Sequence, residues 1–445
     1  MTSDEVAKPI EERKASVPCP DDRSSGAPRP PWLSQLGPGL TTGASDDDPS
    51  GIATYSQAGA QFGFNMAWTL VVSWPLMCAV QEISAQIGRV TGRGLAGNFA
   101  RYFPRPLLYP LIGLLLVANT INLGADLGAM GAALELVIGG PAHLYVLMFA
   151  VFSGFLEVFM RYERYVAMLK WLTLSLFSYV AVVLVVGTPW AEVGTRLVFP
   201  HVGLDGASLT MIVAILGTTI SPYLFFWQAE EEVEETKVRA HARPLIRAPE
   251  QAPAEMRRIQ TDTFVGMGFS NLVAFFIVLA TATTLNARGI TDIQTSAQAA
   301  EALRPVAGEF AFLIFALGII GTGLLALPVL AGSAAYALGE GLGWHVGLSR
   351  SPRRAKIFYA VIAVATLLGA LLNFTSIEPV KALFWTAVVN GVTAVPIMAL
   401  VMLLASRKDA MGDFPISLPL KLVGWLATLV MAAAAAGMFL TWNQG

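Results

Sequence analysis

The sequence predicts an all-α integral membrane protein with eleven transmembrane helices, of which the first and the sixth are broken. The 445 residues are 55% hydrophobic and only 13% charged, with a mean hydropathy of +0.59, whereas soluble domains carry about 25% charged residues. Apolar runs of about 20 residues, the length that spans a bilayer, recur from Gly63 to the C-terminus. A soluble core could not bury so much apolar surface, so the lipid bilayer is a predicted partner.

The predicted spans cover nearly the whole chain after an N-terminal tail. The tail, residues 1–34, is polar and rich in proline and lacks the apolar core of a secretory signal, so we expect a disordered cytoplasmic segment. Cys19 and Cys78 lie far apart and indicate neither a disulfide framework nor a zinc site, and the net charge of -2 does not indicate a nucleic-acid partner. We expect spans at about 37–62, 64–88, 107–138, 142–160, 165–187, 208–229, 262–287, 308–338, 357–373, 383–404 and 417–440.

Basic residues in the loops predict the orientation of these spans. One side of the predicted membrane collects 20 Lys and Arg residues, and the other collects only 4, namely Arg196, Arg288, Arg304 and Lys381. Because Lys and Arg are enriched in cytoplasmic loops, the richer side is predicted to be cytoplasmic. An odd number of spans then places the N-terminus inside and the C-terminus outside a cell (plasma or inner) membrane. The alternation holds only if residues 37–62 count as a span.

The first predicted span contains three consecutive aspartates, in the segment TTGASDDDPSGIATYSQAGA. Each carboxylate at the centre of a membrane helix costs roughly 2.5–3.5 kcal/mol on insertion scales. Asp46, Asp47 and Asp48 must therefore face protein, water or a cation rather than lipid. A re-entrant or surface loop is the alternative, and the alternation of basic loops favours a span.

The sixth predicted span, IVAILGTTISPYLFFWQAEEEVEE, is interrupted near its middle by Pro222. Proline removes a backbone donor and disfavours helix in the residue before it, so Asp48–Pro49 and Ser221–Pro222 are both predicted helix breaks. A single such proline is more often an ordinary kink. Two breaks at matching positions are typical of inverted-repeat transporters with a midplane substrate site. We expect one transporter domain over 35–440, with repeats at about 37–187 and 208–404 and an extra span at 417–440.

These segments resemble the Nramp family of divalent metal transporters. The family's first span reads Gly-Pro-Gly, eight residues, then Asp-Pro-Gly-Asn; here Gly37-Pro38-Gly39 is followed after eight residues by Asp48-Pro49-Ser50-Gly51. The segments EISAQIGRVTGRGLA and FMRYERYVAML extend the likeness, which covers about residues 35–440. The resemblance implies the LeuT-type fold, with a five-plus-five inverted repeat, and uptake of a divalent metal cation as substrate. It implies no cofactor and no protein partner.

Several positions depart from the family's pattern. The asparagine of Asp-Pro-Gly-Asn is Gly51 here, and the family's Met-Pro-His-Asn of span six is Ser221-Pro222-Tyr223-Leu224, so a thioether and a histidine are missing. A second span-six histidine falls at Gln228. In span three, Asp126-Leu127-Gly128-Ala129 keeps the aspartate of Asp-Leu-Ala-Glu and loses the glutamate, and an acidic position seven residues earlier is Asn119.

These departures favour the Nramp-related magnesium transporter branch. A thioether favours manganese and iron, whereas carboxylate, carbonyl and water suit magnesium. Mg²⁺ dehydrates reluctantly, and the small residues Gly51 and Ser221 would leave room for a partly hydrated ion. Because a histidine and a glutamate suited to proton relay are lost, we expect Mg²⁺ transport, with Mn²⁺ as a second candidate substrate, without proton coupling. Asp126 alone could still carry a proton.

The resemblance implies a cation site at the two breaks. Asp48 is the strongest candidate for a direct ligand, and the carbonyls of Ser45 and Thr218, each three residues before its break residue, are further expected ligands. Asp47 and Asp46 are less constrained, because successive helical residues point about 100° apart and three carboxylates cannot all reach one ion. One of them would hold a coordinating water or line the entry path, and a helix cap is the alternative for Asp46.

Other polar residues are candidates for the water shell or the ion pathway. Ser221 and Tyr223 would hold ligating waters, with packing as the alternative for Tyr223. Asn390 in span ten lines the cavity or hydrogen-bonds between helices, and a structural role is favoured for Glu82 and Asn122. The acidic run at the end of span six is expected to start a solvated loop, with easier cation exit as the alternative; it comprises Glu230–Glu232, Glu234 and Glu235. Asp126, Asn119 and Gln228 are the remaining pathway candidates.

Four other functions fit less well than metal transport of the magnesium type. A proton-coupled Mn²⁺/Fe²⁺ transporter of the ordinary Nramp type is the nearest alternative. A LeuT-fold amino-acid transporter binds a substrate carboxylate at bare helix N-termini, and the aspartate cluster would repel it. An intramembrane aspartyl protease needs two aspartates on separate spans in a Gly-x-Gly-Asp context, and Asp126 follows NLGA. A sensor would normally carry a sizeable soluble output domain. We therefore expect a transporter and not an enzyme.

Overall fold

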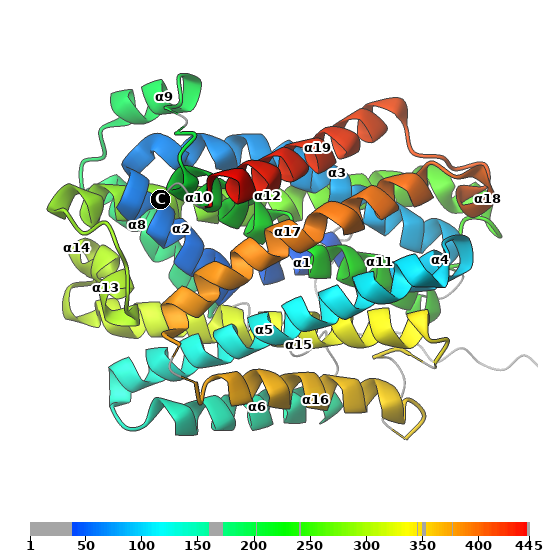
Figure 1. Cartoon of the computed structure of the whole chain (residues 1–445), viewed down its shortest axis with the longest axis horizontal. Coiled ribbons are helices and arrows are strands. Elements are labelled where there is room, and N and C mark those ends of the chain that lie inside the picture. Colours follow the sequence, from blue (N-terminus) through cyan, green and yellow to red (C-terminus); the bar gives the residue numbers. More distant parts are fainter. Residues whose placement is uncertain are drawn as a thin grey trace, which may run out of the picture. The chain divides into compact units, whose positions relative to one another are not determined.

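The computed structural model describes residues 38–159, 172–201, 203–239, 242–344, 346–348, 353–375 and 377–442. Within these ranges the regular structure is entirely helical (Figure 1). The predicted tail, residues 1–34, and the first part of the predicted fifth span lie outside the described residues. The all-α prediction is confirmed.

The predicted segments correspond in order to helices or broken helices. The long ones are α3 (Ala67–Thr91), α5 (Arg105–Ile138), α6 (Ala142–Phe159), α12 (Ala252–Thr284), α15 (Ala311–Gly341), α16 (Lys356–Leu372), α17 (Pro379–Ala405) and α19 (Leu418–Thr441). Short helices connect them or end them: α4 (Leu95–Tyr102), α8 (Phe177–Val185), α9 (Trp190–Val198), α13 (Ser296–Ala300), α14 (Arg304–Ala307) and α18 (Lys408–Met411). In the described part of the chain, 7 helical segments are long and apolar enough to cross a membrane, or up to 8 with one bent pair, while Ala142–Glu157 and Lys356–Leu372 are shorter apolar helices. Eleven crossings remain a prediction.

Both predicted helix breaks are confirmed. The first span consists of α1 (Pro38–Asp46) and α2 (Pro49–Phe62), and the sixth consists of α10 (Gly206–Thr219) and α11 (Pro222–Val238). In each case the proline occupies the first position of the second helix, where its missing N–H and fixed φ cost nothing. The residue before each proline is extended, with ψ 169° at Asp48 and ψ 130° at Ser221. The local sequence therefore determines where each helix restarts.

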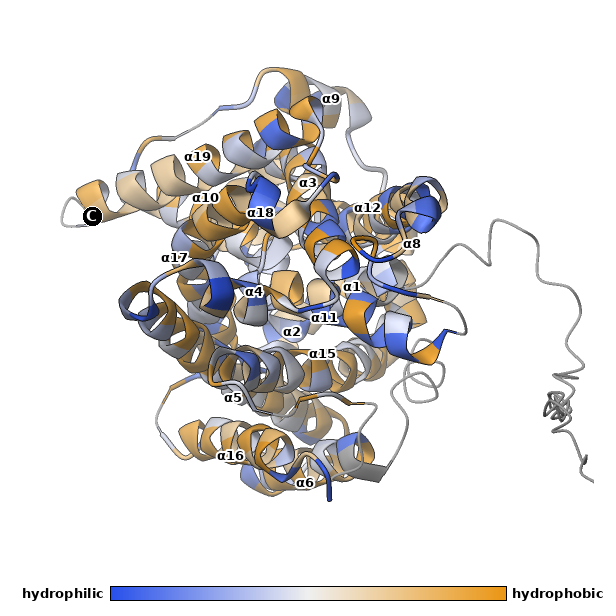
Figure 2. Cartoon of the chain, turned by 90° about the vertical axis from the view of Figure 1, so that its right-hand side faces the viewer, coloured by the Kyte–Doolittle hydropathy of each residue, from blue (hydrophilic) through white to orange (hydrophobic). Residues whose placement is uncertain are grey.

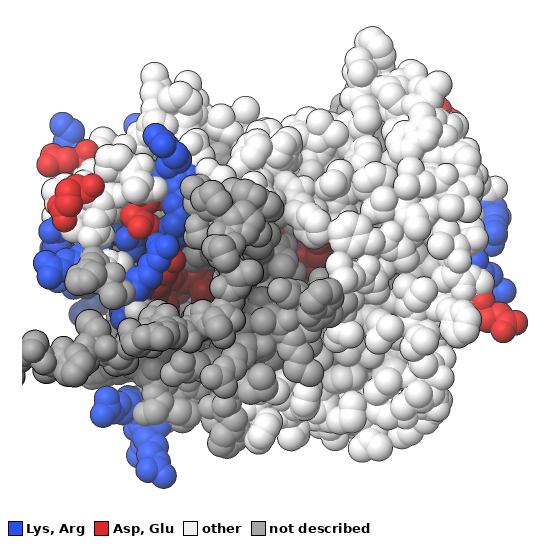
Figure 3. Space-filling model, turned by 180° about the vertical axis from the view of Figure 1, so that it is seen from behind, with Lys and Arg blue, Asp and Glu red and all other residues white. Residues whose placement is uncertain are grey.

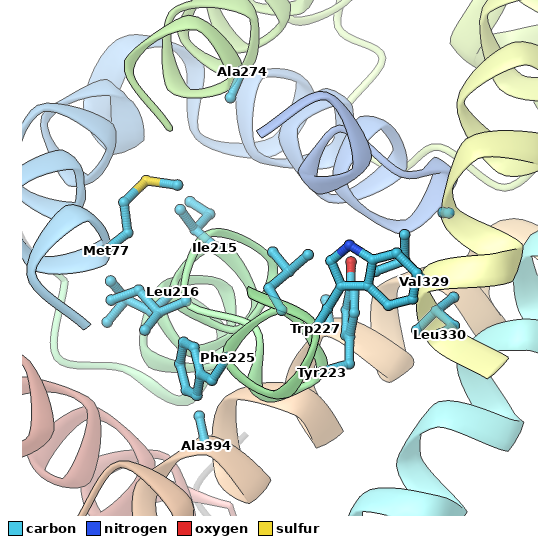
Figure 4. Packing of buried hydrophobic residues seen from close by; sticks show 14 of the residues in the cluster. Met77, Ile215, Leu216, Tyr223, Phe225, Trp227, Ala274, Val329, Leu330 and Ala394 are labelled. Carbon is cyan, nitrogen blue, oxygen red and sulfur yellow. The ribbon is translucent and has the colours of Figure 1, made fainter. Parts of the chain in front are cut away.

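Helices from both predicted halves pack around the broken spans. α5 lies against α15, α16 and α17, and α6 pairs with α16 at one edge of the bundle (Figure 1). At the core, Tyr223 and Trp227 of α11 lie beside Val329 and Leu330 of α15 (Figure 4). Figure 2 shows apolar colouring on the peripheral helices α6, α16 and α19, which matches a surface that lipid would cover.

The helix α1 packs so closely on α12 that the two backbones are in contact at the glycines of α1. A Cβ atom at Gly39 would lie 2.7 Å from the carbonyl carbon of Asp262, and one at Gly43 would lie 2.3 Å from the carbonyl oxygen of Gly266. The Gly39 N–H donates to the Asp262 carboxylate at 2.7 Å. Small residues spaced four apart allow such close approach between helices in a membrane. Gly39 and Gly43 thus allow α1 to pack closely on α12.

The acidic run at the end of span six is not a solvated loop start, so that expectation was wrong. Its residues belong to α11, and Glu230, Glu232 and Glu234 are 2%, 0% and 9% exposed. Arg258 of α12 contacts Glu232 at 2.5 Å and Glu235 at 3.0 Å. Since α12 begins ten residues before the predicted seventh span, it brings this arginine onto α11. Glu232 and Glu235 thus form an ion-pair cluster with Arg258 between the two helices.

Charged side chains gather at the ends of the helical bundle. On the face in Figure 3, the basic residues lie at the two ends, most densely at the end that carries α4 and α18, and not in the broad middle band. Exposed side chains along α16 and α19 are large and apolar, for example Leu367 at 56% and Leu429 at 63%. A charge-poor middle with exposed apolar residues is what a bilayer-spanning protein requires.

Candidate functional site

The Asp48 carboxylate lies at the first helix break and accepts four hydrogen bonds. Its Oδ1 accepts from the Ser50 hydroxyl and from the Gly51 N–H, both at 2.7 Å. Its Oδ2 accepts from the Asn122 amide of α5 and the Tyr223 hydroxyl of α11, both at 3.2 Å. The first pair caps the N-terminus of α2. The second pair is longer and comes from two other helices. Oδ2 is therefore better placed than Oδ1 to exchange a hydrogen-bond donor for a cation or for a water molecule bound to it.

Asp47 and Asp46 point to a different helix from Asp48. The Ser270 hydroxyl of α12 lies 2.6 Å from Asp46 Oδ2 and 3.0 Å from Asp47 Oδ1. One hydroxyl has a single proton to donate, so it cannot satisfy both carboxylates at once. Among the described residues, Asp46 Oδ1 is buried without a hydrogen-bond partner. Asp47 and Asp48 lie between α1 and α2, so the helical spacing on which the expectation for the three carboxylates was based does not apply to them, and that expectation stays a prediction.

The three carboxylates are buried without a basic partner. Asp46, Asp47 and Asp48 are 1%, 4% and 2% exposed, and no Lys or Arg of the described ranges forms an ion pair with them. Burying an unpaired carboxylate is costly, so protons or a cation must compensate the charge. The described residues also hold no group of three His, Cys, Asp or Glu side chains around one point. A metal ion here would therefore depend on one or two carboxylates together with carbonyls and water.

The second break supplies a carbonyl and a hydroxyl beside the first. The Thr218 hydroxyl hydrogen-bonds the Tyr55 hydroxyl of α2 at 2.9 Å. The Ser221 hydroxyl lies 2.7 Å from the Gly217 carbonyl and 2.8 Å from the Thr218 carbonyl. The last carbonyls of a helix lack intrahelical partners, and the negative end of its dipole favours a cation. The Ser45 and Thr218 carbonyls, whose role as ligands stays a prediction, lie in the last turns of α1 and α10.

Gly51 faces the Asp48 carboxylate directly. A Cβ atom at this position would lie 3.5 Å from Asp48 Oδ1, 3.6 Å from the Asp46 carbonyl oxygen and 3.2 Å from the Tyr55 ring. Any side chain larger than alanine would fill the space beside the carboxylate. The glycine therefore leaves the space beside Asp48 free of a side chain.

The predicted pathway residues are all buried, and the structure separates them into two groups. Asn119 of α5 donates to the Leu330 carbonyl at 3.0 Å and the Ser333 hydroxyl at 2.9 Å, so it joins α5 to α15. The polar side-chain atoms of Asp126, Gln228 and Asn390 have no hydrogen-bond partner in the described part of the chain. Buried polar groups normally have partners, so these three are the ones that water or an ion would need to satisfy.

Two residues at the site were not predicted to contact the aspartates. Asn122 was assigned a structural role, yet its amide donates to Asp48 from a position 74 residues away in the chain. Ser270 lies in an apolar span and reaches the aspartate pair across more than 220 residues. One signal was available for Asn122, because it lies one helical turn before Asp126 on the same face of α5.

A connecting loop covers the outer side of α2 and is held by Gln57. The Gln57 amide nitrogen donates to the Thr291 carbonyl at 3.1 Å, and its oxygen accepts from the Ile293 N–H at 2.8 Å. Ile293 is 3% exposed and lines a cavity of only about 10 Å³ with Ile52 and Ser56. This volume is at the lower limit for one water molecule. The two hydrogen bonds of Gln57 thus hold the loop against α2.

Replacing Gln57 with alanine should weaken the attachment of this loop to α2. The variant loses two hydrogen bonds worth about 1 kcal/mol each. We therefore expect a cysteine introduced by Ser56→Cys to react about tenfold or more faster with a water-soluble thiol reagent. The measurement uses a background without the native cysteines. Gln61→Ala is the matched control, because within the described ranges the Gln61 side chain hydrogen-bonds the Gln57 side chain, at 3.2 Å, and does not bond the loop. Equal labelling in both variants would contradict the role of Gln57.

Comparisons with known proteins agree with this architecture. Residues 39–441 match the Nramp family model, "Natural resistance-associated macrophage protein-like". The chain is 25% identical over 416 residues to the divalent metal cation transporter MntH of Burkholderia ambifaria, covering 92% of this chain and 88% of that protein. It is 22% identical over 402 residues to MntH of Deinococcus radiodurans, covering 89% of this chain and 87% of that protein.

Solved structures share the fold at low sequence identity. The manganese transporter of Eremococcus coleocola, in complex with an aromatic bis-isothiourea compound, superposes with a TM-score of 0.71 at 16% identity, over 91% of this chain and 85% of that one. Mhp1, a nucleobase-cation-symport-1 family transporter, gives a TM-score of 0.58 at 15% identity, over 91% of this chain and 92% of that one. These likenesses bear out the LeuT-type architecture that the sequence resemblance implied. The family match covers almost all of the helical region, and the chain therefore belongs to the Nramp family.

Proposed function

We propose that this protein transports divalent metal cations across a membrane, with Mg²⁺ as the preferred ion, Mn²⁺ as a second substrate and no proton coupling. The cation binds partly hydrated at the breaks of α1/α2 and α10/α11. Asp48 is the direct carboxylate ligand, and the Ser45 and Thr218 carbonyls complete the protein's share of the coordination shell. Asp47, Ser221 and Tyr223 hold coordinating waters beside Gly51.

The observation that carries this proposal is the buried aspartate cluster without a basic partner. Three carboxylates at 1–4% exposure need positive charge, and a transported cation supplies it only while it is bound. Two helix C-termini at the same place add the negative ends of their dipoles. An amino-acid carboxylate would be repelled by the same arrangement, which disfavours that alternative.

The donors around Asp48 support magnesium over softer ions. The four groups that hydrogen-bond the carboxylate come from Ser50, Gly51, Asn122 and Tyr223, and all are hydroxyl, amide or backbone groups. Mg²⁺ prefers oxygen ligands and retains several waters, which hydroxyls and amides can orient. Ser221 occupies the position where the family's thioether ligand is expected, so the soft ligand that favours Mn²⁺ and Fe²⁺ is missing.

We further propose that the end with α4 and α18 faces the cytoplasm of a cell (plasma or inner) membrane. The count of basic residues on the two sides of the predicted spans and their crowding at this end in Figure 3 support this orientation. The N-terminus is then cytoplasmic and the C-terminus lies outside.

The proposal is tested by flux into proteoliposomes loaded with Mg²⁺-, Mn²⁺- and pH-sensitive dyes. We expect Mg²⁺ to enter along its gradient without acidification of the lumen, and Mn²⁺ to enter and compete with it. The matched condition adds an ionophore for protons, which should not change the Mg²⁺ flux of an uncoupled transporter. Mn²⁺ entry with acidification and no Mg²⁺ flux would overturn both the ion preference and the uncoupled mechanism.

A proton-coupled Mn²⁺ transporter is the second candidate function. It is favoured by the relatives named as divalent metal cation transporters and by the likeness to a manganese transporter. Asp126, buried in α5 with both oxygens lacking partners among the described residues, would then carry the proton. The pH dye distinguishes this mechanism from the uncoupled one.

A further inference from the structure

A cavity of about 360 Å³ lies at the end of the molecule opposite to α4 and α18. Its wall is formed by the turn between α2 and α3, by the end of α12 and by α9, whose position is seen in Figure 1. The volume is many times that needed to hold one water molecule. None of its lining residues belongs to the aspartate site or to the cover over α2, so the cavity needs a separate explanation.

The helix α9 borders this cavity and exposes large apolar side chains near it. Glu192 and Arg196 line the cavity, with the Glu192 side chain 52% exposed, and Val193 packs inward at 2% exposure. Trp190 and Phe199, at the two ends of α9, are nevertheless 50% and 71% exposed. The axis of α9 makes an angle of 108° with the preceding apolar helix, so a helix that follows a membrane span lies close to the membrane plane. Lipid would cover these exposed apolar side chains, as it does in interfacial helices.

The polar groups in the cavity match both charges of one small zwitterion. Arg196 is held by two weak or shared partners, Glu192 at 4.0 Å and His201 Nδ1 at 2.7 Å, and its guanidinium is a suitable donor to phosphate. Asn65 Oδ1 is buried and has no partner among the described residues, so together with the Glu192 carboxylate it can accept from an ammonium group. By contrast, the other polar lining side chains, Thr283 and Asn286, already bond backbone carbonyls at 2.9 Å and 2.7 Å.

We propose that this cavity binds the headgroup of a phospholipid with a primary amine, phosphatidylethanolamine, from the outer leaflet. Its phosphate pairs with Arg196 and its ammonium donates to Glu192 and Asn65. A choline headgroup of similar charge has no N–H to donate, so it leaves the Asn65 oxygen unsatisfied. The acyl chains lie along the apolar residues beside the cavity, where Leu184 and Val185 of α8 are 68% and 66% exposed. The site does not depend on the transported ion.

The test measures lipid retained by the full-length protein. Wild type is reconstituted in vesicles of equal parts phosphatidylethanolamine, phosphatidylcholine and phosphatidylglycerol, extracted in mild detergent and examined by native mass spectrometry. We expect one phosphatidylethanolamine to be retained preferentially. Arg196→Gln and Glu192→Gln should each lower its retention about tenfold, because each removes a charge-assisted hydrogen bond. Arg304→Gln is the matched control, since Arg304 pairs with Glu301 at 2.8 Å outside the cavity.

Each outcome decides for or against the lipid site. Retention that falls in the two cavity variants and not in Arg304→Gln supports it. Equal retention of phosphatidylcholine, or no difference among the three variants, overturns it. Soluble O-phosphoethanolamine is added as a second arm; if it displaces the lipid at micromolar concentration, the cavity is a site for a soluble zwitterion and the lipid assignment fails. Because no arm measures ion flux, failure of this proposal is distinguishable from failure of the proposed transport function.

Discussion

Replacing Asp48 with asparagine should reduce Mg²⁺ flux by about 100-fold or more while the protein still folds. Asparagine is as good an N-cap as aspartate, so it can still accept from the Gly51 N–H and the Ser50 hydroxyl that hold the side chain at 2.7 Å. What disappears is the negative charge at the centre of the proposed coordination shell, and each 1.4 kcal/mol of lost binding is tenfold in affinity. The flux assay described above, run at equal protein density, gives the result.

The matched control for this variant lies in the same protein. Asp205 caps α10 as Asp48 caps α2, accepting from the Ser208 N–H at 3.0 Å and the Ser208 hydroxyl at 2.8 Å, and these hydrogen bonds lower the pKa of the Asp205 carboxyl below its ordinary value. Asp205→Asn removes a capping charge away from the helix breaks and should leave flux within about twofold of wild type. If both variants transport normally, Asp48 is a structural cap and not a metal ligand.

Replacing Arg258 with glutamine should lower the stability of the folded protein by about 3–5 kcal/mol. The side chain is 8% exposed and lies 2.5 Å from Glu232, which is fully buried. It also contacts Glu235 at 3.0 Å and Glu255 at 2.8 Å and approaches Asp262 at 4.0 Å. Removing the arginine leaves these carboxylates without their central cation, and an uncompensated buried charge is strongly destabilising. A large fall in the unfolding temperature in detergent is the expected result.

A less buried arginine of the same cluster gives the comparison. Arg239 is 43% exposed and pairs with Glu235 at 3.3 Å and Glu255 at 3.5 Å. Exposed ion pairs contribute about 0–1 kcal/mol, so Arg239→Gln should barely change the unfolding temperature. Similar shifts for the two variants would show that burial does not determine the strength of this cluster.

The loss of Arg258 should also disturb the packing of α1. Asp262 accepts from the Gly39 N–H at 2.7 Å and lies at the edge of the Arg258 cluster. The cluster on α11 and α12 is therefore continuous with the contact that fixes the start of α1. In the variant, residual flux should fall even at temperatures where the protein remains folded, because α1 carries the aspartates.

Features that depend on composition and neighbouring residues could be predicted from the sequence. Long apolar stretches predict membrane spans, because the bilayer requires about 20 apolar residues regardless of what packs beside them. Proline blocks helix at its own position and disfavours it in the residue before, so Pro49 and Pro222 located both breaks. The Asp48 position at the first break followed from the same local pattern.

Features that depend on which helices meet could not be predicted in this way. The charged run from Glu230 to Glu235 has the composition of a solvated loop, and only the placement of Arg258 on the neighbouring α12 makes its burial favourable. Likewise, an asparagine or serine in an apolar span is compatible with many packing partners. Nothing in the segments around Asn122 and Ser270 specifies that they meet the aspartates.

The sequence by itself determined that this is a polytopic helical membrane protein of the Nramp family, broken at Asp48–Pro49 and Ser221–Pro222, with carboxylates at the first break. The tertiary structure alone decided how those carboxylates are divided, with Asp48 toward α5 and α11 and Asp46 and Asp47 toward α12. The physical reason is the separation along the chain between the residues that interact. Hydropathy and proline act within one segment, whereas the donors to each carboxylate are set by backbone approach between helices distant in the chain, such as that of α1 to α12 at Gly43.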